Sequence, residues 1–169
     1  KKHIFCEKPL GTNVNEVENA VNAAIISKVI FKTGFTLRFH PGIQKIRSLV
    51  DENKIGKITF IRCRYGITGR PGYEKEWRAD KSISGGGELI DQGVHVLDLL
   101  RWFMGDFSSV KGNIGTLYWD ASVEDNAFGI LKSTNDQMAS FHVSWSEWDN
   151  LFSFEIFGTE GYLRMEGLG

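Results

Sequence analysis

One stretch of the 169-residue sequence places a carboxylate and an imidazole at helical spacing. Asp91, His95, Asp98 and Trp102 stand at i, i+4, i+7 and i+11, so they share one stripe of an expected helix over residues 88–104. A histidine with a near-neutral pKa, oriented by a carboxylate, can take or give a proton in alcohol or carbonyl chemistry. A capped, ion-paired surface face is the alternative, and spacing alone leaves both interpretations open.

The segment Glu7-Lys8-Pro9 is a second candidate. It follows a short apolar run that suits a buried strand, and the proline holds Lys8 in a turn-like geometry rather than on a free surface stem. A cis Lys8–Pro9 bond is one option for that turn. An ordinary solvent-exposed lysine is the alternative.

Three consecutive glycines precede the expected helix, at residues 85–87. Glycines at a helix start let the backbone approach a ligand closely, although a flexible loop would have the same composition. They are not a dinucleotide fingerprint, because Ile90 replaces the third glycine, and the G-x-G at residues 167–169 stops before that position. The sequence therefore contains no recognisable cofactor-binding half.

Composition excludes several classes of function. The chain has 20 basic and 21 acidic residues, so it lacks the positive charge of a general nucleic-acid binder. No apolar run approaches the roughly 18 residues of a membrane-spanning helix. His3, His40 and His142 are too scattered for a metal site, and Cys6 and Cys63 lack C-x-x-C spacing. We expect reduced thiols, a cytoplasmic location and no metal, membrane or nucleic-acid partner.

Hydrophobic periodicity indicates early helices and late strands. This order predicts an α+β fold, with a mostly antiparallel open sheet and helices packed on one face. A long, polar, glycine-rich loop over residues 68–87 precedes the main helix. The expected helices are residues 13–27, 41–55 and 88–104, and the expected strands are residues 2–6, 29–37, 58–67, 110–119, 126–132, 138–145, 151–157 and 162–165.

Several segments taken together resemble the glucose-fructose oxidoreductase, inositol dehydrogenase and MocA family. The similarity runs from residue 3 to about residue 166, and the ordered set is more specific than any single motif. The matching segments are residues 5–10 (FCEKPL), 34–41 (GFTLRFHP), 55–58 (IGKI), 85–98 (GGGELIDQGVHVLD), 124–127 (EDNA) and 158–161 (GTEG).

The resemblance implies an NAD(P)-dependent dehydrogenase in which an N-terminal Rossmann domain binds NAD or NADP. Residues 1–11 would be the end of that domain, and residues 12–169 the substrate-binding and oligomerisation domain, shortened at its C-terminus. The implied reaction transfers a hydride between a sugar or cyclitol carbon and nicotinamide, and this chain alone would be inactive. The implied assembly is a homo-oligomer, a dimer or tetramer formed through the sheet face.

The resemblance also implies roles for individual residues. His95 would move the hydroxyl proton, Lys8 would stabilise the developing alkoxide, and Asp91 would hold the substrate or orient the imidazole. The Glu7-Lys8-Pro9 segment would lie near the nicotinamide. Arg38 and Trp77 would line the substrate pocket.

Substrate identity stays open, with specificity expected from residues 68–84. Three cations in this loop would suit an anionic sugar, but three acidic neighbours weaken that interpretation: Arg70, Lys75 and Arg78 against Glu74, Glu76 and Asp80.

A non-catalytic interaction module is the competing hypothesis. Alternating apolar residues of two expected strands would supply its aromatic-rich surface: Phe141, Val143 and Trp145 with Phe152, Phe154 and Ile156. The presence of Lys8, Asp91 and His95 argues against it, because a pure interface needs none of these groups.

Overall fold

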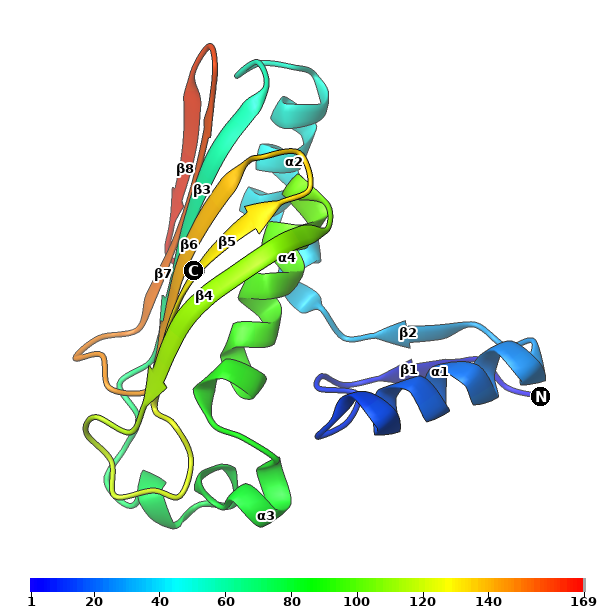
Figure 1. The fold of residues 1–169 in the computed structure, drawn as a ribbon, viewed down its shortest axis with the longest axis vertical. Coiled ribbons are helices and arrows are strands. Elements are labelled where there is room, and N and C mark those ends of the chain that lie inside the picture. Colours follow the sequence, from blue (N-terminus) through cyan, green and yellow to red (C-terminus); the bar gives the residue numbers. More distant parts are fainter. Residues whose placement is uncertain (169) are drawn as a thin grey trace.

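Alternating apolar and polar residues build a six-stranded sheet in the computed structural model, which describes residues 1–168. The strand order is β4-β5-β6-β3-β7-β8, and only the central β3–β6 pair is parallel (Figure 1). The mostly antiparallel sheet is therefore confirmed. Its strands are β3 (Ile58–Gly66), β4 (Phe107–Gly115), β5 (Asn126–Ser133), β6 (Met138–Ser144), β7 (Leu151–Gly158) and β8 (Tyr162–Glu166).

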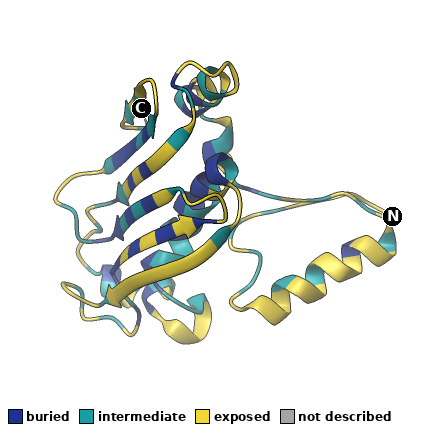
Figure 2. Cartoon of the chain, turned by 45° about the horizontal axis from the view of Figure 1, so that its top comes forward, coloured by how far each residue is buried: buried dark blue, intermediate teal, exposed yellow. Residues whose placement is uncertain are grey.

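Two helices cover one face of this sheet and leave the other face open (Figure 1). These are α2 (Pro41–Asp51) and α4 (Val94–Met104). Their apolar stripes pack on the inward-facing residues of the strands and form one core, in which Ile43, Leu99 and Phe154 are fully buried. In Figure 2 buried and exposed residues alternate along the central strands, as the period of two requires.

The prediction that six apolar residues form an exposed surface for an interaction module is wrong. All six of its residues are at most 8% exposed, because they lie on the inward side of β6 and β7 or, for Trp145, directly after β6. The side chains at the alternate positions of these strands point to the open face instead. Periodicity shows which residues share a face of a strand, but it does not show which face the helices cover.

A smaller βαβ unit precedes the large sheet. Strand β1 (Ile4–Cys6) pairs in parallel with β2 (Phe31–Thr33), and α1 (Val14–Ser27) connects them. This unit, which we call the arm, projects away from the six-stranded sheet in Figure 1. It extends across the domain boundary that we predict at residue 11, and that division stays a prediction.

Several predicted elements differ from the structure. The helix expected over residues 41–55 ends at Asp51, and the strand expected over residues 110–119 spans Phe107–Gly115 instead. The strand expected over residues 29–37 ends at Thr33, and the chain then forms a 3-10 helix, η1 (Thr36–Phe39), because β1 offers only three residues for pairing. The long loop over residues 68–87 contains three short helices: η2 (Tyr73–Lys75), η3 (Trp77–Ala79) and α3 (Lys81–Ser84).

The helix expected over residues 88–104 is continuous but not uniformly α-helical. Its first part, η4 (Leu89–Gly93), is a π-helical turn, and α4 follows it directly. Within residues 1–168, no helix has the length and apolar character needed to cross a membrane.

Candidate active site

Lys8 and Asp91 meet across a separation of 83 residues. The Lys8 ammonium donates to Asp91 Oδ1 and to the Asp91 carbonyl oxygen, each at 2.6 Å. Both side chains are largely buried, and the Lys8–Pro9 peptide bond is cis. The structure therefore joins the end of β1 in the arm to the π-helical turn η4, and brings together two of the predicted site residues.

His95 lies in the first turn of α4 and is 7% exposed. Its ring packs edge-on against Phe35, with centroids 6.2 Å apart, and its Nδ1 has no hydrogen-bond partner within residues 1–168. Burial is the main cause that lowers the pKa of His95 to about 4, and the Lys8 charge lowers it further, whereas Asp91 acts in the opposite direction. The imidazole is therefore neutral at pH 7, with a ring nitrogen free to accept a proton.

Arg78 supplies a second cation for Asp91. Its Nε lies 3.3 Å from Asp91 Oδ2, and its guanidinium stacks 4.5 Å from the ring centroid of Trp77. Both side chains line a cavity of about 140 Å³, to which Pro9, Asp91 and Trp145 also contribute. The sequence alone left Arg78 as one of three loop cations, and only its position beside Trp77 distinguished it from the other two.

Two of the acids that weakened the anionic-substrate interpretation have other partners. Glu76 pairs with Arg70 at 2.7 Å, and Asp80 accepts hydrogen bonds from the backbone N–H and hydroxyl of Ser82. Neither acid is among the residues that line the cavity with Arg78.

Arg38 pairs with Asp98, outside the cavity that Arg78 and Asp91 line. Its Nε and Nη2 donate to the two carboxylate oxygens of Asp98 at 2.7 and 2.6 Å, and its guanidinium lies 5.3 Å from the Trp102 ring centroid. These three side chains form a structural cluster beside α4, and none of them lines the Asp91 cavity. Asp98, in the C-terminal half of the predicted polar stripe, is thus ion-paired, but its side chain is only 9% exposed and does not form the surface face of the alternative interpretation.

Glycines hold the backbone of the site in place. A Cβ at Gly87 would collide with the carbonyl oxygen of Glu124, and a Cβ at Gly34 would lie 2.9 Å from Glu7 Oε2. Glycine at these positions therefore lets the chain segments of the site approach closely. π-Helical turns such as η4 often occur at functional sites.

Glu88 is a buried residue that the sequence reasoning missed. It is 0% exposed, and burial is the main cause that raises its pKa to about 10, followed by the charge of Asp91. Glu88 lies three residues before Asp91 on the polar side of the helix pattern, so the sequence pattern gave no sign that it would be buried.

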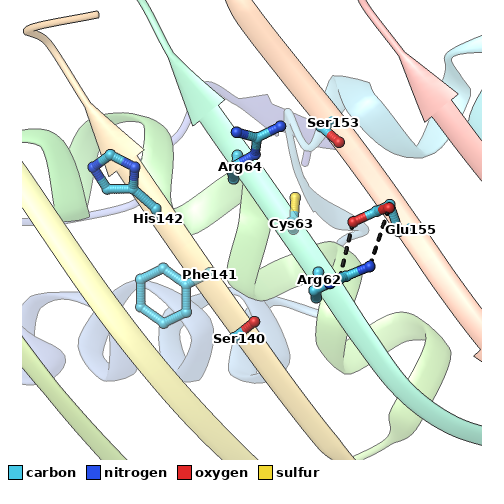
Figure 3. A pocket seen from close by; sticks show the side chains of 8 residues that line it. All are labelled: Arg62, Cys63, Arg64, Ser140, Phe141, His142, Ser153 and Glu155. Carbon is cyan, nitrogen blue, oxygen red and sulfur yellow. Dashed lines mark hydrogen bonds and ion pairs between the residues drawn. The ribbon is translucent and has the colours of Figure 1, made fainter.

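A second cavity lies on the open face of the sheet, away from Lys8, Asp91 and His95. It measures about 430 Å³, and its polar lining includes Arg62, Arg64, His142 and Glu155 (Figure 3). Arg62 pairs with Glu155 across β3 and β7, with Nε and Oε2 3.0 Å apart.

Comparisons with known proteins identify relatives of this chain and of its fold. The model of the GFO/IDH/MocA C-terminal domain matches residues 43–164. Levoglucosan dehydrogenase of Pseudarthrobacter phenanthrenivorans is 28% identical over 95% of this chain and 48% of its own length. The 1,5-anhydro-D-fructose reductase of Ensifer adhaerens is 29% identical over 96% of this chain and 49% of its own length.

The structural comparison gives the same result. A solved structure of levoglucosan dehydrogenase in complex with NADH and levoglucosan is similar with a TM-score of 0.90 at 29% identity, over 97% of this chain and 47% of that one. This chain spans about half the length of the curated relatives it matches. The family model covers most of the chain and the fold agrees, so this chain belongs to the GFO/IDH/MocA family and contains that family's C-terminal domain.

Proposed function

We propose that the full-length protein is an NAD(P)-dependent oxidoreductase that interconverts a hydroxyl and a carbonyl on a sugar or cyclitol. The observation that carries this proposal is the contact of Lys8 with Asp91 beside a neutral, buried His95. The relatives support it, because a dehydrogenase and a reductase of sugar derivatives are both similar to this chain.

The residues present fit the reacting end of a nicotinamide cofactor. Buried His95, with its unpartnered Nδ1, provides a base, and the Lys8 ammonium provides a cation within electrostatic reach of that ring. When bound, the cofactor accepts or donates the hydride at the substrate carbon. The sequence has no glycine fingerprint for the rest of a dinucleotide, so we assign only this reacting end to the Glu7-Lys8-Pro9 segment.

Each residue has a separate task in the proposed reaction. Neutral His95 accepts the hydroxyl proton during oxidation and returns it during reduction. Lys8 has three ammonium protons, of which two lie on Asp91, and the third is available to stabilise the alkoxide oxygen. Asp91 holds that ammonium in place.

Trp77 and Arg78 are the proposed substrate contacts in the loop. Trp77 is 55% exposed and presents a ring face on which a sugar can pack, and the guanidinium of Arg78 offers donors to hydroxyl or acidic groups. Arg38 was also predicted to bind substrate, and its pairing with Asp98 places it second to Arg78 in this proposal.

Turnover by the full-length protein tests the proposal. A panel of sugars, anhydrosugars and cyclitols is offered with NAD⁺ and with NADP⁺, and the reduced nicotinamide is followed by absorbance. His95→Ala and Lys8→Ala should each lower kcat/KM by about 100- to 10,000-fold, because each removes a group that acts on the transferred proton or the alkoxide.

Lys45→Ala is the matched control, because Lys45 is an exposed lysine on α2, outside the candidate site. It should leave kcat/KM unchanged. Turnover that survives both His95→Ala and Lys8→Ala would remove the assigned roles.

We also propose that the open face of the sheet carries self-association. Large apolar side chains are exposed on it, among them Phe128 and Ile130 on β5, which are 45% and 54% exposed. Ile130→Asp should shift the full-length protein towards monomer in sedimentation experiments. A protein that sediments as a monomer before any substitution would contradict this proposal.

A further inference from the structure

Glu88 is a buried acid that the proposed reaction does not use. Neither of its carboxyl oxygens has a hydrogen-bond partner within residues 1–168, and the residue is completely shielded from solvent. An ionised carboxylate without a partner is among the costliest groups to bury, so such a group keeps its proton instead. Glu88 is therefore a neutral acid in the folded protein.

The backbone around Glu88 is held on both sides. The Glu88 N–H donates to the Glu124 carbonyl oxygen at 3.0 Å, and the Leu89 N–H donates to Glu124 Oε1 at 3.2 Å. The Asp91 N–H donates to the Gly87 carbonyl oxygen at 3.0 Å. This anchoring fixes Glu88 relative to Asp91, three residues further along the chain.

Titratable groups from several elements face Glu88. The Asp91 and Glu124 charges disfavour its ionisation, and the Lys8 charge favours it. Glu88 and Asp91 in turn raise the pKa values of the Tyr65 and Tyr73 hydroxyls, for which burial is the first cause. Glu88 thus lies within electrostatic reach of both members of the Lys8–Asp91 pair.

Trp145 gives the carboxyl a polar neighbour. Its indole Nε1–H is buried and lies close enough to Glu88 to lower the pKa of that carboxyl, although the two groups do not form a hydrogen bond of normal geometry. No other acceptor within residues 1–168 takes this N–H. An apolar side chain at position 88 would leave the indole with no polar neighbour for its N–H.

We infer that Glu88 is a positioning residue that, as a neutral acid, keeps Lys8 paired with Asp91 and so leaves one ammonium proton for the substrate oxygen. An ionised Glu88 would repel Asp91 and compete with it for Lys8. This inference rests on the proposed function for its kinetic readout, but the protonation state of Glu88 is measurable without turnover.

The experiment compares Glu88→Gln, which stays neutral and polar, with Glu88→Leu, which stays neutral but is apolar. In the full-length protein at pH 7, difference infrared spectroscopy should show the carbonyl stretch of a protonated carboxylic acid that disappears in Glu88→Gln. Glu160→Gln, an exposed change in the turn between β7 and β8, should leave this band in place.

Kinetics then separate positioning from packing. Glu88→Gln should keep kcat/KM close to that of the wild type at pH 7 and move its alkaline decline to higher pH, because one of the groups that ionise there is gone. Glu88→Leu should lower kcat about tenfold with little change in KM, because the Lys8–Asp91 pair shifts.

Three results would overturn the inference. These are an ionised Glu88 at pH 7, an alkaline decline that Glu88→Gln does not move, or a Glu88→Leu variant with wild-type kcat. Failure of the proposed function looks different, because the infrared band would persist while His95→Ala and Lys8→Ala left turnover intact.

Discussion

The arm and the six-stranded sheet carry apolar side chains in similar patterns but bury them very differently. In the sheet region Leu99 and Ile156 are 0% exposed, whereas in the arm Ile25 and Ile26 of α1 are 66% and 78% exposed. The sheet region completes its core within the described residues, and the arm does not. Periodicity therefore shows which face of an element is apolar, but burial depends on a second layer of structure.

The candidate site lies where these two regions meet. The arm contributes Lys8, the π-helical turn η4 contributes Asp91, and α4 contributes His95. The chemistry of the imidazole thus depends on a charge from the less buried region, since Lys8 lowers the pKa of His95.

The largest expected effect is on the free energy of unfolding, when one apolar residue from each region is replaced by alanine. Leu99→Ala should lower the free energy of unfolding by about 2–5 kcal/mol, because it leaves a cavity in the core. Ile26→Ala should change it by no more than about 0.5 kcal/mol, because that side chain is already exposed. Denaturant unfolding of this chain measures both, and equal losses would remove the distinction between the two regions.

An intermediate effect concerns the pKa of His95. Lys8→Met should raise it by up to about one unit, or about 1.4 kcal/mol, because the second largest cause of its depression is removed. Ring-nitrogen NMR follows the titration, with Lys45→Met as the control. A pKa of His95 that Lys8→Met leaves unchanged would show that the Lys8 charge does not contribute to its depression.

The same shift predicts a pH dependence of stability. The pKa of His95 in the folded chain, about 4, lies below its ordinary value of 6.5, so the unfolded chain binds the proton first as pH falls. The contribution of neutral His95 to the free energy of unfolding is therefore complete above pH 6.5 and is lost as pH falls towards about 4. Lys8→Met should narrow the pH interval over which this stability is lost, because it raises the pKa of His95 in the folded chain. Urea unfolding between pH 4 and 7 measures this interval.

The smallest effect should stay within the arm. Asn13 Oδ1 accepts the Glu16 N–H at 3.1 Å and caps α1, so Asn13→Ala should destabilise that helix by about 1 kcal/mol. Hydrogen exchange should accelerate in α1 and remain unchanged in β3 and β6. Asn13→Ser, which keeps a capping oxygen, is the control, and faster exchange throughout the sheet would show that the two regions unfold together.

Local patterns predicted much of the fold. The helices expected to begin at residues 13 and 41 and the strand expected over residues 138–145 follow from patterns between near neighbours, and the structure has α1 from Val14, α2 from Pro41 and β6 over Met138–Ser144. The π-helical form of η4 was not predictable in this way, since the apolar stripe suits an α-helix equally well. The prediction of an exposed aromatic surface was wrong because the face of a sheet that becomes covered depends on where distant helices pack.

The sequence alone determined the residue types of the site, the order of the elements and, through resemblance, the family. Only the tertiary structure decided that Arg78 rather than Arg38 meets Asp91, that Lys8 reaches Asp91 from the arm, and that Glu88 is buried among charged groups. The physical reason is that charge pairing and desolvation act between atoms brought together from distant parts of the chain, whereas helix capping and periodicity act between neighbours.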